Sequence, residues 1–262
     1  MLAELHGKIS RTASNLTDRS EDELTGNFLG HLRYLPFEQG FGAVLRQAVR
    51  PAALADQFAS TTLDYWADRL SFWPRYQDQE SNVELDALLS LDSALIGLEF
   101  KLYSNLSSDD EINNDHSDNN ELSCNQLAKE ARIISAQRRS DQQGLLLLIA
   151  DQNACRAIYA DVQSRKLLPP DITLGCLSWQ DILTALQTLR PSDAYSQLIL
   201  SDLQSLLIAK GFQHFRSMAL DDCPNIAADD YFRYASSAAA RLTPFTLDYP
   251  QSVDQGDYYE YR

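Results

Sequence analysis

The chain has 262 residues, of which 44% are hydrophobic, enough to bury a core in one domain or in one domain with a short appendage. Its four cysteines form no CxxC pair and its four histidines are scattered, which argues against a disulfide framework and a structural zinc site. The net charge of −15 would repel a polyanion at long range if it were spread evenly. Because the first residues lack a signal-peptide pattern and no apolar run could span a membrane, we expect a cytoplasmic protein without membrane contact.

The N-terminal part of the chain predicts two helices. Ser20 and Glu23 form a capping box, and apolar residues recur at helical spacing until a proline, so we expect an amphipathic helix over 21–35. A second helical stretch, opened by a proline, is expected over about 51–70.

A β-hairpin is predicted after these helices. The aromatic stretch SFWPRYQ is typical of an edge strand, and two apolar runs flanking residues 91–93 predict hairpin strands near 83–90 and 94–103. Successive residues of a strand point to opposite faces. Glu99 and Lys101 therefore share one face of the second strand, and the opposite face is apolar.

The remaining chain predicts a parallel βαβ unit. Residues 104–121 carry six carboxylates and no basic residue, which favours a mobile acidic loop. After an expected helix over 124–139, strands and helices alternate, as in a parallel sheet covered by helices. We therefore expect one domain over 1–215, followed by a C-terminal helical segment and acidic tail over 216–262.

The shared face of Glu99 and Lys101 is a candidate site for chemistry. A buried charged pair costs several kcal/mol per ion unless partners, a cation or water compensate it. Gly97 would leave a gap on that face, and the hairpin can bring Asp86 opposite Glu99. Two converging carboxylates repel each other, and an oxygen-only site favours magnesium or manganese over zinc. Lys101 could then orient an attacking water and stabilise charge on a phosphate.

The same residues resemble a known nuclease signature. Asp86, followed after twelve residues by Glu99-Phe100-Lys101, is similar to the D...ExK motif of the PD-(D/E)XK nuclease superfamily. The resemblance covers about residues 20–215 and implies a restriction-endonuclease-like fold, a three-layer α/β/α arrangement with a central mixed sheet. It also implies that Asp86, Glu99 and the backbone of Phe100 hold Mg²⁺, with Mn²⁺ as a substitute.

Two helices supply further candidates in this superfamily. The resemblance implies a catalytic acid on the first helix, for which Glu21 fits best because Glu23 is already explained by capping. It also implies a polar residue on the helix after the ExK strand, which Gln126 matches, with Glu130 one turn later. A departure is Leu85, which stands where the signature has proline. Three alternatives stay open: an exposed ExK ion pair, a Glu21 that only complements its helix dipole, and a Gln126 on a solvated helix face.

The function implied by the resemblance is a magnesium-dependent phosphodiesterase that cleaves nucleic acid, as a DNA endonuclease of restriction or phage-defence type. Lys129, Arg132 and Arg139 would form one basic stripe for phosphate contacts, or else a solvated helix face. The alternative function is a catalytically inactive, nuclease-like acidic binding protein or a subunit of a larger complex. DNA or RNA as substrate, and a homodimer or a partner subunit, stay open.

Overall fold

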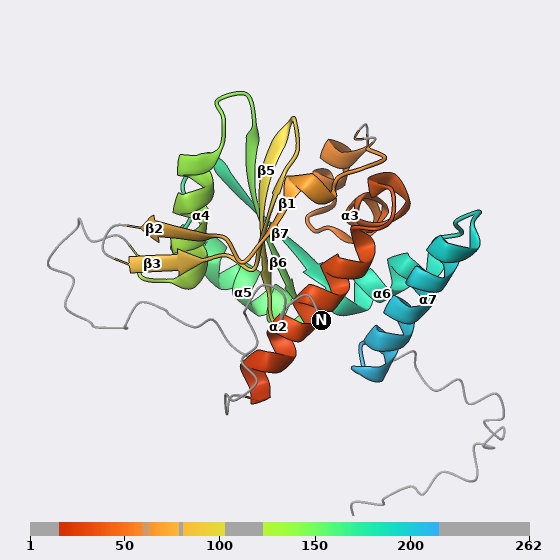
Figure 1. The fold of residues 1–262 in the computed structure, drawn as a ribbon. Helices are drawn as coiled ribbons and strands as arrows, with labels where there is room; N and C mark the ends of the chain where they lie inside the picture. Colours follow the sequence, from red (N-terminus) through yellow and green to blue (C-terminus); the bar gives the residue numbers. More distant parts are fainter. Residues whose placement is uncertain (1–15, 60, 62, 79–80, 103–122, 215–262) are drawn as a thin grey trace, which may run out of the picture. The chain divides into compact units, whose positions relative to one another are not determined.

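The computed structural model describes residues 16–59, 61, 63–78, 81–102 and 123–214 of the chain (Figure 1). All of these residues belong to one compact unit, Met1–Phe215. The predicted acidic loop over 104–121 and the predicted C-terminal segment over 216–262 lie outside the described residues. Within the described part, no helix is both long enough and apolar enough to cross a membrane.

A five-stranded mixed sheet organises this unit, in the strand order β1-β4-β5-β6-β7. Its strands are β1 (Leu70–Phe72), β4 (Ala87–Ser90), β5 (Ala94–Phe100), β6 (Gln143–Ala150) and β7 (Ile172–Ser178). β1, β4 and β5 pair antiparallel, whereas β5, β6 and β7 run parallel. The prediction of an α/β protein with a mixed sheet is therefore confirmed.

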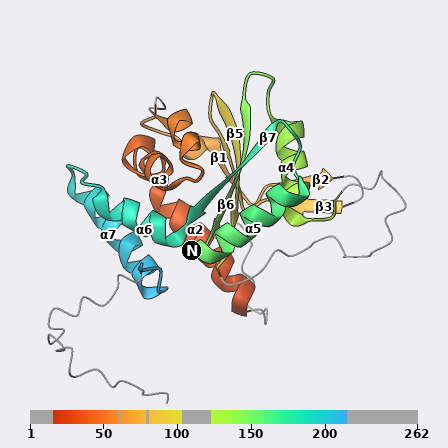
Figure 2. The same ribbon diagram turned by 180° about the vertical axis from the view of Figure 1, so that it is seen from behind.

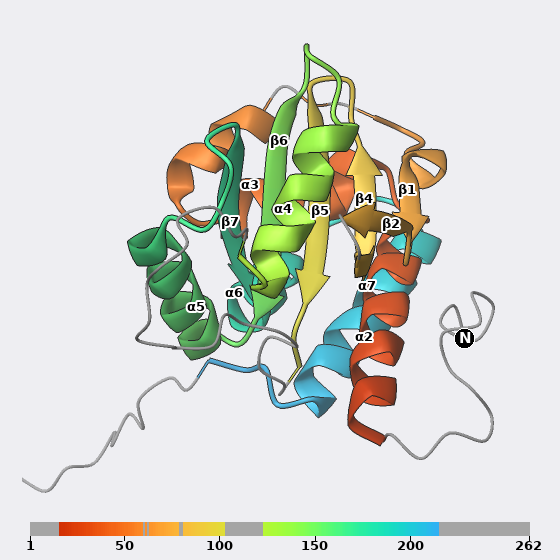
Figure 3. The ribbon, with the colours of Figure 1, turned by 90° about the vertical axis from the view of Figure 1, so that its left-hand side faces the viewer.

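Helices pack on both faces of the sheet. The opposite views of Figures 1 and 2 show α4 on one side of the strands and α3 and α6 on the other, and Figure 3 looks onto α4 and α5 with the sheet behind them. The helices are α2 (Leu16–Leu32), α3 (Phe41–Ala48), α4 (Gln126–Gln137), α5 (Gln152–Arg165), α6 (Trp179–Thr188) and α7 (Ala194–Ala209). α7 packs on α2 and α6.

β5 separates two apolar cores because its side chains alternate between the faces of the sheet. Ile96, Leu98 and Phe100 join the core that α2, α3, α6 and α7 complete. Leu95 lies in the second core, with Leu127, Ala131, Ile133 and Ile134 of α4. All seven residues of β5 are buried, so a charged side chain on this strand enters an otherwise apolar environment.

An aromatic cluster anchors the carboxyl end of β5. Phe28 of α2 makes edge contacts with Phe41, Phe100 and Trp179, at centroid distances of 5.3 to 6.3 Å. Such ring pairs contribute about 0.5–1.5 kcal/mol beyond the area that they bury. Trp179 also donates a hydrogen bond from Nε1 to the carbonyl of Lys101, at 2.9 Å. The end of β5 is therefore fixed to both α2 and α6.

The helix predicted over 51–70 is wrong. That stretch forms two 3₁₀ helices, Ala52–Phe58 and Ala67–Arg69, and the described residues between them, 59, 61 and 63–66, are not helical. The intervening Ser, Thr and Asp residues compete for backbone hydrogen bonds and disfavour a continuous helix. A helix that the sequence analysis missed, α3, lies just before this stretch and is only eight residues long.

The predicted hairpin is also interrupted. β3 (Ser81–Glu84) pairs with β2 (Arg75–Asp78) in a separate two-stranded sheet, and only β4 pairs with β5. The chain bends at Leu85 and Asp86, where Leu85 N donates to the carbonyl of Pro74 and Trp73 N donates to the carbonyl of Asp86. A strand over 83–90 was therefore correct only in its second half, because the first half pairs with a different partner.

The expected gap beside Gly97 is filled. A Cβ at this position would lie 2.5 Å from Ile134 Cδ1 and 3.0 Å from Leu85 Cδ2. Glycine at this position lets α4 approach β5 closely rather than leaving space for a ligand.

We expect Gly97→Ala to lower the free energy of unfolding by about 1–3 kcal/mol, because the added methyl group overpacks the contact with Ile134. Ile134→Val alone should cost about 0.5–1.5 kcal/mol. The double variant should lose less than the sum of the two single variants, since valine removes the clashing Cδ1. Urea denaturation of the four proteins measures this coupling, and strictly additive losses would contradict the predicted contact.

Candidate functional site

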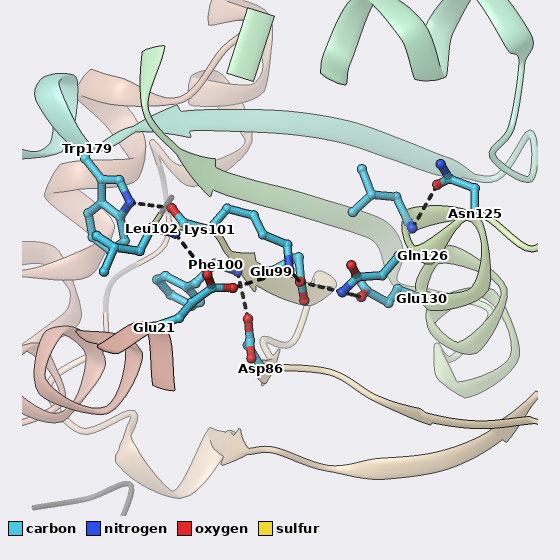
Figure 4. A network of polar contacts seen from close by, with 11 residues as sticks. Glu21, Asp86, Glu99, Phe100, Lys101, Leu102, Asn125, Gln126, Glu130 and Trp179 are labelled. Atoms are coloured by element: carbon cyan, nitrogen blue, oxygen red, sulfur yellow. Dashed lines mark hydrogen bonds and ion pairs between the residues drawn. The ribbon is translucent and has the colours of Figure 1, made fainter. Parts of the chain in front are cut away.

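Glu99 and Lys101 form a buried ion pair at the carboxyl end of β5 (Figure 4). Lys101 Nζ lies 2.7 Å from Glu99 Oε1, and the two residues are only 6% and 2% exposed. The alternative of an exposed surface ion pair is therefore wrong. Charges at this depth need partners to offset the loss of water, and three other elements supply them.

Glu21 reaches the pair from α2. Its Oε1 lies 3.3 Å from Lys101 Nζ, and its Oε2 accepts a hydrogen bond of 3.2 Å from the Leu102 N–H. Glu23 is exposed, whereas Glu21, the preferred candidate of the two, contacts the lysine. Because α2 begins at Leu16, Glu21 lies beyond its first turn, where a helix dipole acts weakly. Contact with Lys101 explains its position better than the helix dipole does.

Asp86 approaches from the bend between β3 and β4. Its Oδ2 accepts a hydrogen bond of 2.8 Å from the Phe100 N–H (Figure 4). In a strand, the N–H and C=O of one residue point to the same side. The Phe100 carbonyl therefore faces the side from which Asp86 approaches, which places the three predicted metal-binding groups, those of Asp86, Glu99 and Phe100, at one end of β5.

Gln126 and Glu130 come from α4, whose first turn is capped by the Asn125 side chain. Gln126 Nε2 donates to Glu99 Oε1 at 2.5 Å and to Glu130 Oε1 at 2.9 Å. Gln126 therefore does not belong to a solvated helix face. Glu130 is 1% exposed, and its Oε2 is buried without a hydrogen-bond partner. Glu130 had no predicted role, although its spacing of one turn from Gln126 was a signal that it faces the same strand.

The pKa values of the carboxyl groups are raised throughout this cluster. Burial raises the pKa values of Asp86 and Glu99 well above their usual range. The negative charge of Glu99 raises the pKa of Asp86 further, and that of Glu130 raises the pKa of Glu99 further. Burial and the charge of Asp86 raise the pKa of Glu130 to about 8. Burial alone would lower the pKa of Lys101, but the carboxylates of Glu99 and Glu21 raise it. The lysine therefore stays charged, and one ammonium does not balance the surrounding acids.

The cluster contains oxygen atoms that could bind a hard cation, although they do not surround one common point. In the ranges that the structure describes, no three acidic, histidine or cysteine side chains are arranged to hold a metal ion. The reason lies in the present hydrogen bonds, because Lys101 binds Glu99 and Glu21 while Phe100 N–H binds Asp86. The unpartnered Oε2 of Glu130 and the raised carboxyl pKa values nevertheless fit an additional positive charge.

The three predicted nucleic-acid contacts are not brought together. Arg132 forms a half-buried ion pair with Asp78, with Nη2 and Oδ2 2.5 Å apart. Arg139 lies beyond the end of α4 and pairs with Asp141 at 3.2 Å. Lys129 is half-exposed on α4. Arg139 therefore does not belong to a stripe on the helix, whereas nucleic-acid contact by the three residues stays a prediction.

Comparison of the chain with protein-family models, curated proteins and solved structures finds no significant match.

The raised pKa of Glu130 predicts how stability depends on pH. Between its ordinary value of 4.5 and its folded value of about 8, the folded protein retains a proton that the unfolded chain releases. The free energy of unfolding should therefore fall as the pH rises through this window, by at most about 1.4 kcal/mol per pH unit for this group.

We expect Glu130→Gln to flatten this fall, because an uncharged amide of similar shape replaces the buried acid. Urea denaturation in EDTA across the window measures the slope for wild type, for this variant and for Glu23→Gln, a control at an exposed glutamate of α2. Equal slopes in the Glu130 variant and wild type would show that Glu130 is not the source.

Proposed function

We propose that the protein is a metal-dependent phosphodiesterase with a restriction-endonuclease-like fold that acts on nucleic acid. The observation that carries this proposal is the convergence of Asp86, Glu99 and Lys101 at the carboxyl end of a buried strand in a mixed sheet. Glu21 and Gln126 join them from flanking helices. The substrate in this proposal is DNA, cut internally, as expected for a PD-(D/E)XK enzyme of restriction or phage-defence type.

The residues of the cluster fit magnesium, with manganese as its substitute. The carboxylates of Asp86 and Glu99 and the carbonyl of Phe100 would hold the ion, and Glu130 offers a further buried oxygen that has no hydrogen bond. These donors are all oxygen atoms, which hard divalent cations prefer. When bound, such an ion would supply positive charge to a phosphate and make a nearby water more acidic.

Lys101 would act as a fixed positive charge beside the phosphate. Its ammonium group can only donate hydrogen bonds, so it would orient the attacking water and stabilise the negative charge that grows in the transition state. Glu21 holds the lysine by accepting a hydrogen bond from its Nζ, and Gln126 holds the Glu99 carboxylate by donating to Oε1. Both are positioning residues in this proposal.

The alternative function is an inactive, nuclease-like acidic binding protein or subunit. One observation favours it: Lys101 already binds Glu99 and Glu21, and the described residues hold no ready metal-binding group of three. The net charge of −15 would suit a basic partner. Metal binding separates this alternative from the enzyme.

Catalysis is tested by cleavage of supercoiled plasmid DNA in magnesium. We expect Lys101→Met to reduce the cleavage rate by about 100-fold or more, because the charge that stabilises the transition state is lost. Asp86→Asn should reduce it similarly. Lys210→Met, at a half-exposed lysine at the end of α7, is the matched control and should cleave within about twofold of wild type. A wild type that cleaves neither DNA nor RNA with any divalent cation would refute the enzyme.

Metal binding is tested by calorimetric titration with Mn²⁺ in the absence of nucleic acid. We expect one or two ions per chain, with affinity lowered about tenfold or more in Asp86→Asn and in Glu99→Gln, because each substitution removes a charged oxygen donor. Asp92→Asn removes an exposed carboxylate elsewhere and should leave the affinity unchanged. If wild type binds no Mn²⁺, the inactive binding protein becomes the better explanation.

A further inference from the structure

A cavity of about 410 Å³ lies between the carboxyl end of β7, the first half of α5 and the segment that follows α3. None of its lining residues belongs to the acidic cluster of the proposed active site. Its volume is in the range of small-molecule sites, and ligands of α/β proteins commonly bind outside the carboxyl ends of parallel strands. The cavity is therefore a candidate for a second, separate binding site.

The walls of this cavity are fixed by backbone pairing. Arg50 and Cys176 exchange two hydrogen bonds of 2.8 Å between their backbones, which ties the segment after α3 to the edge strand β7. The side chains of Cys155 and Cys176 are buried in an apolar cluster with Leu148 and Ala150. The cavity thus has a rigid apolar floor.

Several polar groups that line the cavity have no protein partner. Among the described residues, nothing forms a hydrogen bond or ion pair with the Arg156 guanidinium, the Gln152 side-chain amide or the Tyr159 hydroxyl. Within the described ranges, Arg50 donates through Nη1 to the backbone carbonyls of Gln47 and Val49 and forms no ion pair with a carboxylate. Convergent polar groups above an apolar floor are typical of ligand sites.

The local charge of the cavity is positive, although the chain carries −15. Asp181 is the acidic residue among the described lining residues, and it is already engaged: its Oδ2 accepts from Ser178 Oγ at 2.7 Å, and its Oδ1 lies 3.4 Å from His214 Nε2. The first N–H groups of α5 are bonded to the Asp151 side chain, so the helix end is not what would bind an anion. The two arginines supply that charge.

We propose that this cavity binds a small anion that bears a flat aromatic group, as nucleoside monophosphates do. The guanidinium groups of Arg156 and Arg50 match the geometry and charge of a phosphate. The Tyr159 ring and the apolar floor match a flat ring, and the Gln152 amide can bond to its polar edge. This inference does not rest on the proposed nuclease function.

Calorimetric titration of the full chain in EDTA, with AMP, GMP, CMP and UMP in turn, tests the proposal. At least one nucleotide should bind at a single site, and its nucleoside and inorganic phosphate should each bind about tenfold or more weakly. Arg156→Gln should weaken binding of that nucleotide about tenfold or more, and Tyr159→Leu should also weaken it. Arg165→Gln lies on the same helix, where Arg165 pairs with Asp161 at 3.0 Å, and should leave the affinity unchanged.

Three outcomes would overturn the proposal. The first is that none of the four nucleotides binds, and the second is that phosphate alone binds as tightly as the nucleotide. The third is that Arg156→Gln leaves the affinity unchanged or lowers it no more than Arg165→Gln does. Arg156 is exposed, so its substitution should not disturb folding. Circular dichroism melting of each variant verifies this.

Discussion

The buried ammonium of Lys101 is the charge around which one end of the sheet is organised. It lies between Glu99 of β5 and Glu21 of α2, and both carboxylates offset the cost of burying its charge. The same stretch of backbone is fixed on the opposite face by Phe100, whose ring lies in the aromatic cluster and whose N–H binds Asp86. Apolar packing on one face thus holds the polar groups of the other in position.

Much of this arrangement could be predicted from local sequence patterns. The alternation of strands and helices after residue 139 predicted the parallel unit, and the structure has β6, α5, β7 and α6 in that order. The spacing of Asp86, Glu99 and Lys101 predicted that the three residues lie near one another. Glu99 and Lys101 form an ion pair, and Asp86 binds the backbone N–H of Phe100 between them. These features depend on residues close in sequence or on the regular geometry of one strand pair.

The features that the sequence did not reveal depend on long-range packing. The break at Asp86 arises because β3 pairs with β2 instead of continuing the sheet, a choice between partners that hydrophobic alternation does not resolve. The burial of Glu130 depends on how closely α4 approaches β5. Gly97 permits this close approach because it has no side chain, and Ile134 of α4 packs against it. The bridge from Arg50 to Cys176 likewise joins distant segments. No local pattern encodes these contacts.

The hydrogen bonds from Lys101 to Glu21 and from Trp179 to Lys101 span 80 and 78 positions of the chain. During translation, α2 leaves the ribosome long before the strand that it supports, and the lysine gains its last neighbour only when Trp179 emerges. The acidic cluster therefore cannot be complete in the growing polypeptide before Glu130 of α4 has emerged, and α6 supports it only later. Whatever chemistry the cluster performs is withheld until these later segments have been made.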